Sequence, residues 1–181
     1  MLGLDHLFMV PAADPPHRQP PVASATQRRD MLALALKEFS ELELDERELK
    51  RGGASYTVDT LREYREQYDD VSLALLMGTD AFDDIESWHQ WQCLPELAHL
   101  VVLRRPGLVP KQLPGWAQAR TCATPRTLEQ SPAGKIYFQP VAPQPVSATV
   151  IRRNLATGES VDDMLPSPVL DYINANHIYI E

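Results

Sequence analysis

Residues 145–152, with the sequence PVSATVIR, combine two hydroxyl groups and a guanidinium at the start of an apolar-periodic stretch. Ser147 stands where the N-cap of a helix belongs, and Thr149 and Arg152 are three residues apart, so both project from one face. The first N–H groups of a helix lack intrahelical partners and carry the positive end of the dipole. These residues therefore suit a phosphate. From spacing alone, an ordinary serine cap beside a surface arginine is the simpler interpretation.

Polar residues also follow three predicted strands at the point where each strand ends. They are Pro15-Pro16-His17-Arg18 after residues 6–10, Gly78-Thr79-Asp80 after residues 72–77, and Arg104-Arg105 after residues 100–103. In parallel α/β sheets, ligands bind beyond the carboxyl ends of the strands. The convergence of these residues at one edge predicts a binding site there. Each has a simpler interpretation: a strand-to-helix turn with Asp80 as its cap, a solvated His17-Arg18 pair, and a solvent-facing Arg104.

The elements that position these residues alternate between strand and helix. A Ser24/Gln27 capping box opens a helix whose apolar face carries Met31, Leu32, Ala35, Leu36 and Phe39. Further helices are predicted over residues 57–68, with Val58, Leu61, Tyr64 and Tyr68 buried, and over 80–86, 88–97 and from a Ser167 cap to 174. Further strands are predicted around Leu42 and Leu44 and over residues 72–77, 100–103 and 135–139. This order predicts an α/β fold, a Rossmann-like parallel sheet with helices on both faces, in a single domain over residues 1–181.

Composition excludes several classes of protein. The net charge of −8 argues against a nucleic-acid binder, which would normally carry a basic face. The longest apolar run, residues 73–77, is too short to span a bilayer, and the N-terminus lacks the pattern of a signal peptide. Cys93 and Cys122 are the only cysteines and have no metal-type spacing. We expect a reduced, cytoplasmic protein without a membrane partner.

Three weaker patterns do not predict a site. His89 and Cys93, four residues apart, make only two ligands, and no protein-bound metal is predicted. The acidic residues between Asp80 and Glu86 are most simply a solvated face. Residues 45–48, with the sequence DERE, are most simply an exposed charged turn.

Several blocks in order resemble the bacterial nicotinate-nucleotide adenylyltransferases, of the Rossmann-like nucleotidyltransferase superfamily. The blocks are Pro15-Pro16-His17-Arg18, Leu44-Asp45-Glu46-Arg47-Glu48-Leu49, Ser55-Tyr56-Thr57, Gly78-Thr79-Asp80, Trp88, Arg104-Arg105-Pro106 and Val146-Ser147-Ala148-Thr149-Val150-Ile151-Arg152. The resemblance runs over nearly the whole chain. It implies transfer of the adenylyl group from ATP to nicotinate mononucleotide, giving deamido-NAD and pyrophosphate, with Mg²⁺ accompanying ATP.

The resemblance also implies roles for individual residues. On the ATP side, it assigns the phosphates to Ser147, Thr149, Arg152 and Arg104, close backbone approach to Gly78 and the ribose hydroxyls to Asp80. On the substrate side, Trp88 would stack on the pyridine ring, and Thr57 and the backbone N–H of His89 would bind the nicotinate carboxylate. Tyr56 would join this site, and His17 and Arg18 would meet the phosphate of the mononucleotide. A core role for Trp88 is the alternative without the family.

The chain departs from the family pattern in two places. Family members begin with a strand, a Gly-Gly-Thr-Phe-Asp-Pro-x-His-x-Gly-His type loop and a helix, and this sequence starts at what resembles the second strand. The phosphate-binding histidines of that loop have no counterpart, so no catalytic residue is identified, and we expect the polypeptide as written to show little adenylyltransferase activity. Ala12-Ala13 also replaces the asparagine common in the family. The alternatives are a non-catalytic nucleotide-binding or scaffold protein and a sister adenylyltransferase. The oligomeric state is left open.

Overall fold

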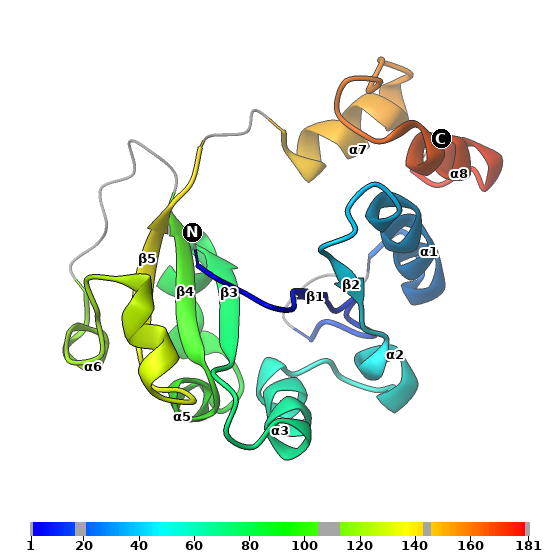
Figure 1. The fold of residues 1–181 in the computed structure, drawn as a ribbon. Coiled ribbons are helices and arrows are strands. Elements are labelled where there is room, and N and C mark those ends of the chain that lie inside the picture. The colour runs from blue at the N-terminus through cyan, green and yellow to red at the C-terminus, as the bar shows by residue number, and fades with distance from the viewer. Residues whose placement is uncertain (1, 17–20, 105–112, 143–145, 180–181) are drawn as a thin grey trace. The chain divides into compact units, whose positions relative to one another are not determined.

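The computed structural model describes residues 2–16, 21–104, 113–142 and 146–179. It divides into two compact units (Figure 1). Unit 1 comprises Met1–Gly3 and Tyr56–Pro143, and unit 2 comprises Leu4–Ser55 and Gln144–Glu181. Within the described ranges, no helix combines the length and apolar character needed to cross a membrane.

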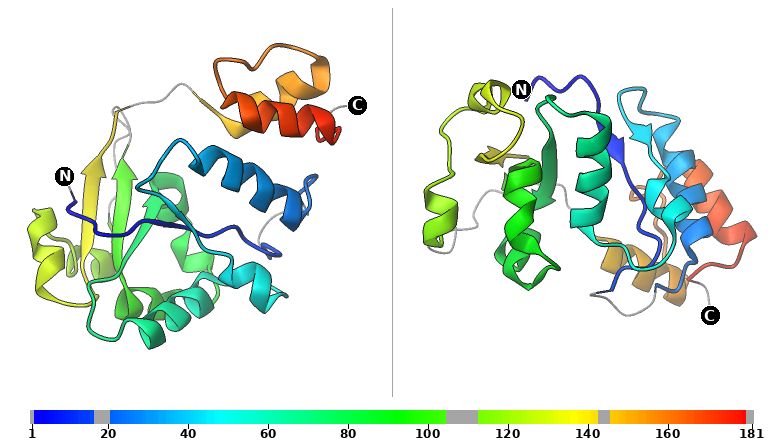
Figure 2. Two further views of the ribbon diagram at one scale, coloured as in Figure 1. Left: turned by 45° about the vertical axis from the view of Figure 1, so that its right-hand side comes forward. Right: turned by 90° about the horizontal axis from the view of Figure 1, so that it is seen from below.

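Unit 1 is built on a parallel sheet of three strands in the order β3-β4-β5. The strands are β3 (Ala74–Gly78), β4 (His99–Arg104) and β5 (Ile136–Pro140), and Figure 2 shows them running in one direction. The register pairs Gly78 with Leu103 and Arg104 with Pro140, so the three carboxyl ends meet at one edge. The predicted parallel α/β architecture is confirmed.

The central strand β4 is the most buried part of unit 1. Its first four residues are inaccessible to solvent, and β4 lies between β3 and β5 in the sheet. Leu100 and Val102 share one face of the strand and join a core cluster with Val58 and Leu61 of α3. Val101 points to the opposite face and is equally buried.

The helices of unit 1 are short except for the first. They are α3 (Thr57–Gln67), α4 (Thr79–Asp83), η1 (Ile85–Ser87), η2 (Trp91–Cys93), α5 (Leu94–Leu97), α6 (Gly115–Gln118) and η3 (Pro125–Gln130), the η elements being 3₁₀ helices. Val58, Leu61 and Tyr64 form the predicted buried stripe of α3. Tyr68 was wrongly included in that stripe, since it caps the helix and is only half-buried.

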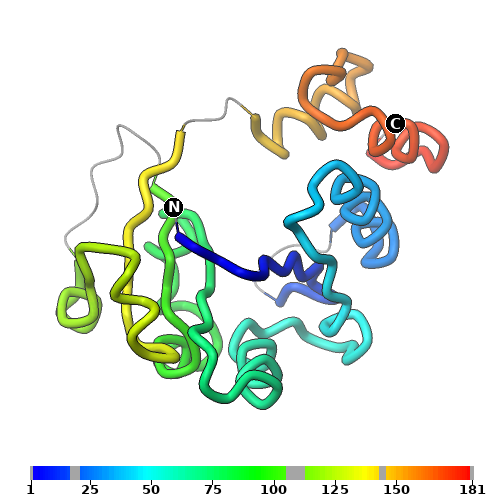
Figure 3. The backbone as a smooth tube through the Cα atoms, viewed as in Figure 1, coloured from blue at the N-terminus to red at the C-terminus, as the bar shows by residue number. Residues whose placement is uncertain are grey.

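Unit 2 combines the N-terminal part of the chain with its C-terminal helices. Figure 3 follows its backbone from β1 (Phe8–Met9) through α1 (Ala25–Leu36) to β2 (Glu43–Leu44) and α2 (Arg47–Arg51). The strands β1 and β2 pair in parallel. The helices α7 (Ala148–Thr157) and α8 (Ser167–Ala175) complete the unit.

The core of unit 2 joins residues from both ends of the chain. Its buried residues are Ala23, Ile151, Leu155, Val161, Val169, Ile173 and Ile178. Helix α1 packs against α8, and the hydroxyl of Tyr172 donates to Oδ2 of Asp30 at 2.8 Å. This hydrogen bond raises the pKa of the Tyr172 phenol, because it favours the protonated form.

Three sequence-based predictions for unit 2 need correction. The face of α1 that packs on the core carries Met31, Leu34 and Ala35, whereas Phe39 lies beyond the helix end and is 48% exposed. Residues 45–48 are not an exposed turn. Asp45 and Arg47 form an ion pair with both side chains less than one-fifth exposed, and Glu48 is buried within α2. Helix α8 starts at Ser167 rather than after it, without a side-chain cap.

Candidate functional site

The carboxyl edge of the sheet in unit 1 brings Gly78, Asp80 and Arg104 into one region. Gly78 ends β3 and pairs with Leu103, and Arg104 is the next residue of β4. The hydroxyl of Thr79 donates to the carbonyl of Leu103 at 3.4 Å, which ties the start of α4 to this edge. Asp80 lies in the first turn of α4 and is exposed. Its side chain makes no N-cap hydrogen bond, so the plain capping interpretation of Asp80 lacks support.

Gly78 leaves open space at the end of β3. Its φ of −76° and ψ of 164° are values that any residue can adopt. A Cβ added to Gly78 would meet no atom within 4 Å. The backbone conformation therefore does not require glycine here. What glycine provides is room for another molecule to approach the main chain closely.

A second group of predicted residues meets at the start of α3. Tyr56 is the N-cap of this helix, and Thr57 is its first residue. The ring of Tyr56 lies against the imidazole of His89, with centroids 4.3 Å apart and planes inclined by 35°. Two sequence blocks that are distant along the chain, Tyr56-Thr57 and Trp88-His89, are thus brought together.

Trp88 connects the two 3₁₀ helices η1 and η2. Its N–H donates to the carbonyl of Ile85, and its carbonyl accepts from the N–H of Trp91. The indole is half-buried and packs against the core cluster of unit 1. Trp88 is therefore neither a fully buried core residue nor a fully exposed one.

The predicted phosphate-binding residues of unit 2 lie at the start of α7. Ser147 occupies the N-cap position, as predicted, but its side chain makes no capping hydrogen bond. Ser147, Thr149 and Arg152 are all exposed. The Nε of Arg152 donates to the carbonyl of Ala148 at 3.0 Å, within the same turn. The simpler interpretation of Ser147 as an ordinary side-chain cap is thus not supported.

The loop that precedes His17 and Arg18 is held by two residues that the sequence analysis did not single out as a pair. The guanidinium of Arg28 donates to the carbonyls of Ala12 and Ala13, at 2.6 and 3.0 Å. The Oγ of Ser55 accepts from the N–H groups of Ala13 and Asp14, at 2.8 and 3.3 Å. This part of the backbone is therefore fixed from both sides. Nothing in the local sequence indicates it, because the partners are distant along the chain. His17 and Arg18 themselves lie outside the described residues.

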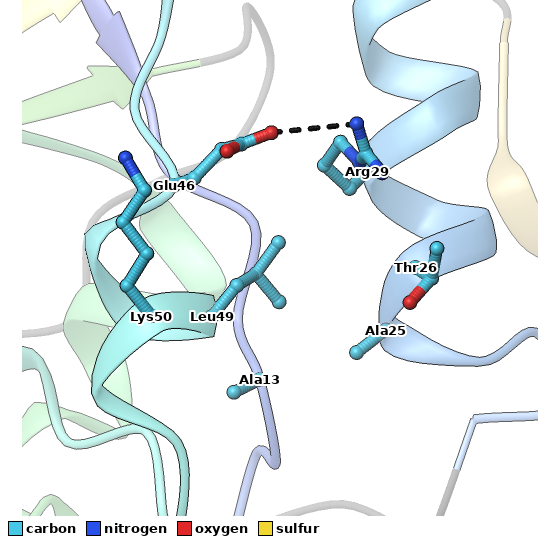
Figure 4. A pocket seen from close by; sticks show the side chains of 7 residues that line it. All are labelled: Ala13, Ala25, Thr26, Arg29, Glu46, Leu49 and Lys50. Carbon is cyan, nitrogen blue, oxygen red and sulfur yellow. Dashed lines mark ion pairs between the residues drawn. The ribbon is translucent and has the colours of Figure 1, made fainter.

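Unit 2 also contains a pocket of about 320 Å³. It is lined by Ala13, Ala25, Thr26, Arg29, Glu46, Leu49 and Lys50 (Figure 4). Arg29 and Glu46 face one another across it as an ion pair at 3.5 Å. Glu46 and Leu49 belong to one of the resemblance blocks, but no residue to which the sequence assigns a binding role lines this pocket. Its charged groups are also partly paired, so we do not take it as the site.

Two histidines have shifted pKa values for opposite reasons. Burial lowers the pKa of His99, which lies at the amino end of β4, away from the carboxyl edge. The carboxylate of Glu43 raises the pKa of His6 through a hydrogen bond of 2.6 Å and its negative charge. Within residues 2–16, 21–104, 113–142 and 146–179, no group of three or more His, Cys, Asp or Glu side chains is placed to hold a metal ion.

Comparison with known proteins identifies the family. Residues 1–154 match the model of the cytidylyltransferase-like family. The chain is 41% identical over 184 residues to the probable nicotinate-nucleotide adenylyltransferase of Escherichia coli O17:K52:H18, covering 99% of this chain and 86% of the relative. It is 42% identical, with the same coverage, to the nicotinate-nucleotide adenylyltransferase of Escherichia coli O157:H7. The chain belongs to the nicotinate-nucleotide adenylyltransferase family.

Solved structures agree with the fold of this adenylyltransferase family. The nicotinic acid mononucleotide adenylyltransferase of Plasmodium falciparum, complexed with NaAD, superposes with a TM-score of 0.69. The superposition covers 96% of this chain and 82% of the Plasmodium falciparum chain, and the two sequences are 16% identical. The same protein complexed with APC gives a TM-score of 0.66 at 15% identity. Membership of the nicotinate-nucleotide adenylyltransferases confirms the resemblance and the enzyme class inferred from the sequence.

Proposed function

We propose that this chain transfers the adenylyl group of ATP to nicotinate mononucleotide, a step of NAD biosynthesis. The observation that carries this proposal is the contact between Tyr56 and His89, which joins the two blocks that the family resemblance assigns to the pyridine side. The names of relatives at 41–42% identity support the same substrate. The partners are then small nucleotides, and the reaction is that of a cytoplasmic enzyme.

In this reaction, a phosphate oxygen of the mononucleotide attacks the α-phosphorus of ATP. The new P–O bond gives deamido-NAD, and the bond to the β-phosphate oxygen breaks, so that pyrophosphate leaves with the electron pair. The attacking phosphate is already an anion and needs no general base. The protein therefore contributes by positioning the two phosphates and by stabilising the developing negative charge.

The residues proposed for ATP provide groups suited to these tasks. Ser147 and Thr149 offer exposed hydroxyls at the start of α7, and Arg152 offers an exposed guanidinium one turn later. Gly78 gives the nucleotide room to approach the main chain, and the Asp80 carboxylate can accept from ribose hydroxyls. Arg104 at the end of β4 adds a further cation for phosphate.

The residues proposed for nicotinate mononucleotide include aromatic rings and donors. The accessible part of Trp88 stacks on the pyridine ring, with Tyr56 beside it. Thr57 and the backbone N–H of His89 donate to the nicotinate carboxylate. An amide in place of that carboxylate would bring its own N–H donors against these donors, which favours the acid. His17 and Arg18 bind the phosphate of the mononucleotide.

Magnesium is proposed to arrive with ATP. The phosphate-binding set, Ser147, Thr149 and Arg152, consists of hydroxyls and a cation, and it contains no carboxylate. Such a set suits phosphate oxygens rather than Mg²⁺, which binds proteins mainly through carboxylates and substrate phosphates. When bound, the ion would neutralise negative charge on the phosphates.

The test of this function is binding and turnover with matched tryptophan variants. Calorimetry should detect binding of nicotinate mononucleotide and of ATP to the wild-type protein, and a pyrophosphate assay with both ligands measures whether the polypeptide as written turns them over. Trp88→Ala should weaken binding of the mononucleotide by about 1–3 kcal/mol, as expected for lost stacking, and spare ATP. Trp88→Phe keeps an aromatic face and should retain most of the affinity. An equal loss for both ligands would remove Trp88 from this role, and binding without pyrophosphate release would favour the non-catalytic alternative.

A further inference from the structure

Gln90, which follows Trp88-His89, has an unusual backbone conformation. Its φ of 51° and ψ of 38° lie in the left-handed region, which only glycine and, less often, asparagine or aspartate adopt readily. Its carbonyl accepts from the N–H of Cys93 at 2.9 Å. Such strain persists only where the surroundings hold it in place, and it is concentrated at functional sites.

The side chain of Gln90 is held by α3. Nη2 of Arg62 donates to Oε1 of Gln90 at 2.5 Å, and Nη1 of Arg62 forms an ion pair with Oδ1 of Asp59 at 3.1 Å. A guanidinium can only donate hydrogen bonds. The Gln90 amide must therefore turn its oxygen toward Arg62 and its NH₂ group away from it.

That orientation determines the tautomer of His89. The Nε2 of Gln90 lies 3.0 Å from the Nε2 of His89. An amide NH₂ only donates, so the Nε2 of His89 must accept. A neutral imidazole that accepts at Nε2 carries its proton on Nδ1. In the part of the chain that the structure describes, no hydrogen-bond partner is seen for this Nδ1–H.

We propose that Arg62 and Gln90 are positioning residues that lock His89 as the Nδ1–H tautomer and thereby set the preference for an acid over an amide on the pyridine ring. This inference rests on the proposed function. An imidazole locked in this way offers a donor beside the ring of Tyr56, and a donor is complementary to a carboxylate. The other tautomer would offer an acceptor at Nδ1. This acceptor would repel a carboxylate and would accept a hydrogen bond from the NH₂ group of an amide.

The tautomer is measured directly by NMR on the ¹⁵N-labelled protein, without substrate. Nitrogen–proton correlations of the imidazoles distinguish a protonated ring nitrogen from an unprotonated one, and His89→Asn assigns the signal. We expect His89 in the wild-type protein to carry its proton on Nδ1. In Gln90→Met and Arg62→Met, which remove the donor or the group that orients it, the Nε2–H form should appear. A wild-type His89 protonated on Nε2 would overturn the proposal whatever the protein binds.

Selectivity is measured as the ratio of dissociation constants for nicotinate and nicotinamide mononucleotides. Arg62→Met and Gln90→Met should each lower the preference for the acid by roughly tenfold to a hundredfold, the worth of one hydrogen bond to a charged group. Arg62→Lys keeps a hydrogen-bond donor at this position and should retain most of the preference for the acid. The matched control is Arg126→Met, at an exposed arginine of the same unit, which should change nothing.

The outcomes separate this inference from the proposed function. Wild-type selectivity that survives in both Met variants, despite a changed tautomer, contradicts the inference and leaves the function intact. A wild-type protein that binds neither mononucleotide contradicts the proposed function, and the NMR measurement then still decides whether Arg62 and Gln90 hold His89.

Discussion

Glycine is not required at position 78 for folding, so a substitution there can test ligand binding alone. Because its backbone angles suit any residue and a Cβ would meet nothing, Gly78→Ala should leave the fold intact. It should even stabilise the protein by about 0.4–1 kcal/mol, since alanine restricts the unfolded chain. If ATP approaches the main chain here, the added methyl group should weaken ATP binding by roughly tenfold.

Thermal unfolding and ATP calorimetry on the same samples test this prediction. Gly115→Ala is the matched control, because a Cβ at Gly115 also meets no atom within 4 Å. ATP affinity that is the same in Gly78→Ala and in the wild type would place the nucleotide elsewhere.

Among the residues that the structure describes, Arg152 forms no hydrogen bond or ion pair outside its own helical turn. Its side chain is exposed and donates to the carbonyl of Ala148. Arg152→Ala should therefore change the free energy of unfolding by less than about 0.5 kcal/mol. If Arg152 binds phosphate more strongly in the transition state, kcat/KM should fall by roughly tenfold to a hundredfold.

The control for Arg152 is its neighbour. Arg153→Ala removes the same charge from the next position of α7, which is also exposed. If both variants lose activity equally, the effect comes from net charge, and the specific role of Arg152 is wrong.

At the level of single elements, the start of α1 is the clearest link between sequence and structure. The Oγ of Ser24 accepts from the N–H of Gln27, and the Gln27 side chain accepts from the N–H of Ser24. This is the capping box that the sequence predicts. Ser24→Ala should cost about 1 kcal/mol of unfolding free energy. Urea denaturation measures it, and Thr26→Ala, in the first turn, should not reproduce the loss.

Sequence predicts a helix or strand well where local spacing determines it. Sequence predicts it less well where packing against distant residues determines which face is buried or where the element ends. The spacing of Val58, Leu61 and Tyr64 predicts the buried stripe of α3, because one helix face meets one core. The periodicity of α1 predicted the wrong residue, because Leu34 rather than Phe39 packs against the core of unit 2. Helix α1 ends before Phe39 because of the residues that follow the helix, and apolar periodicity does not show where a helix ends.

The candidate site also contains features that the sequence predicts and features that it does not. Resemblance predicts Tyr56 and His89 as members of one site, and their rings do meet. The left-handed backbone of Gln90 and its link to Arg62 were missed, because they depend on a contact between α3 and the segment after Trp88. No local pattern encodes such a contact. The roles of the residues on both the ATP side and the substrate side stay predictions.

At the level of the whole protein, His99 links stability to pH. Its Nε2 donates to the carbonyl of Ser131, and its Nδ1 accepts from the N–H of Lys135, at 2.8 and 3.0 Å. Burial lowers its pKa in the folded state, so protons bind the unfolded chain preferentially. The contribution of His99 is therefore complete above the unfolded pKa of 6.5 and is lost as the pH falls below it.

Urea titrations between pH 5 and 8 test this link. The wild-type free energy of unfolding should fall more steeply below about pH 6.5 than that of His99→Gln, which can still donate to Ser131 but does not titrate. Parallel pH profiles for the two proteins would contradict it. The same titrations examine the expectation of one domain, which predicts a single cooperative transition.

The pairing of α1 with α8 has a consequence for synthesis on the ribosome. The hydrogen bond from Tyr172 to Asp30 spans 142 positions of the chain. Residues 4–55 of unit 2 are therefore synthesised long before α8, against which α1 packs. Residues 56–143 form the main part of unit 1 and do not need α8 in order to fold. The released fragment of residues 1–143 should be cut readily by protease within α1 and resist cleavage within β4. Equal protection of both would show that the N-terminal segment folds without α8.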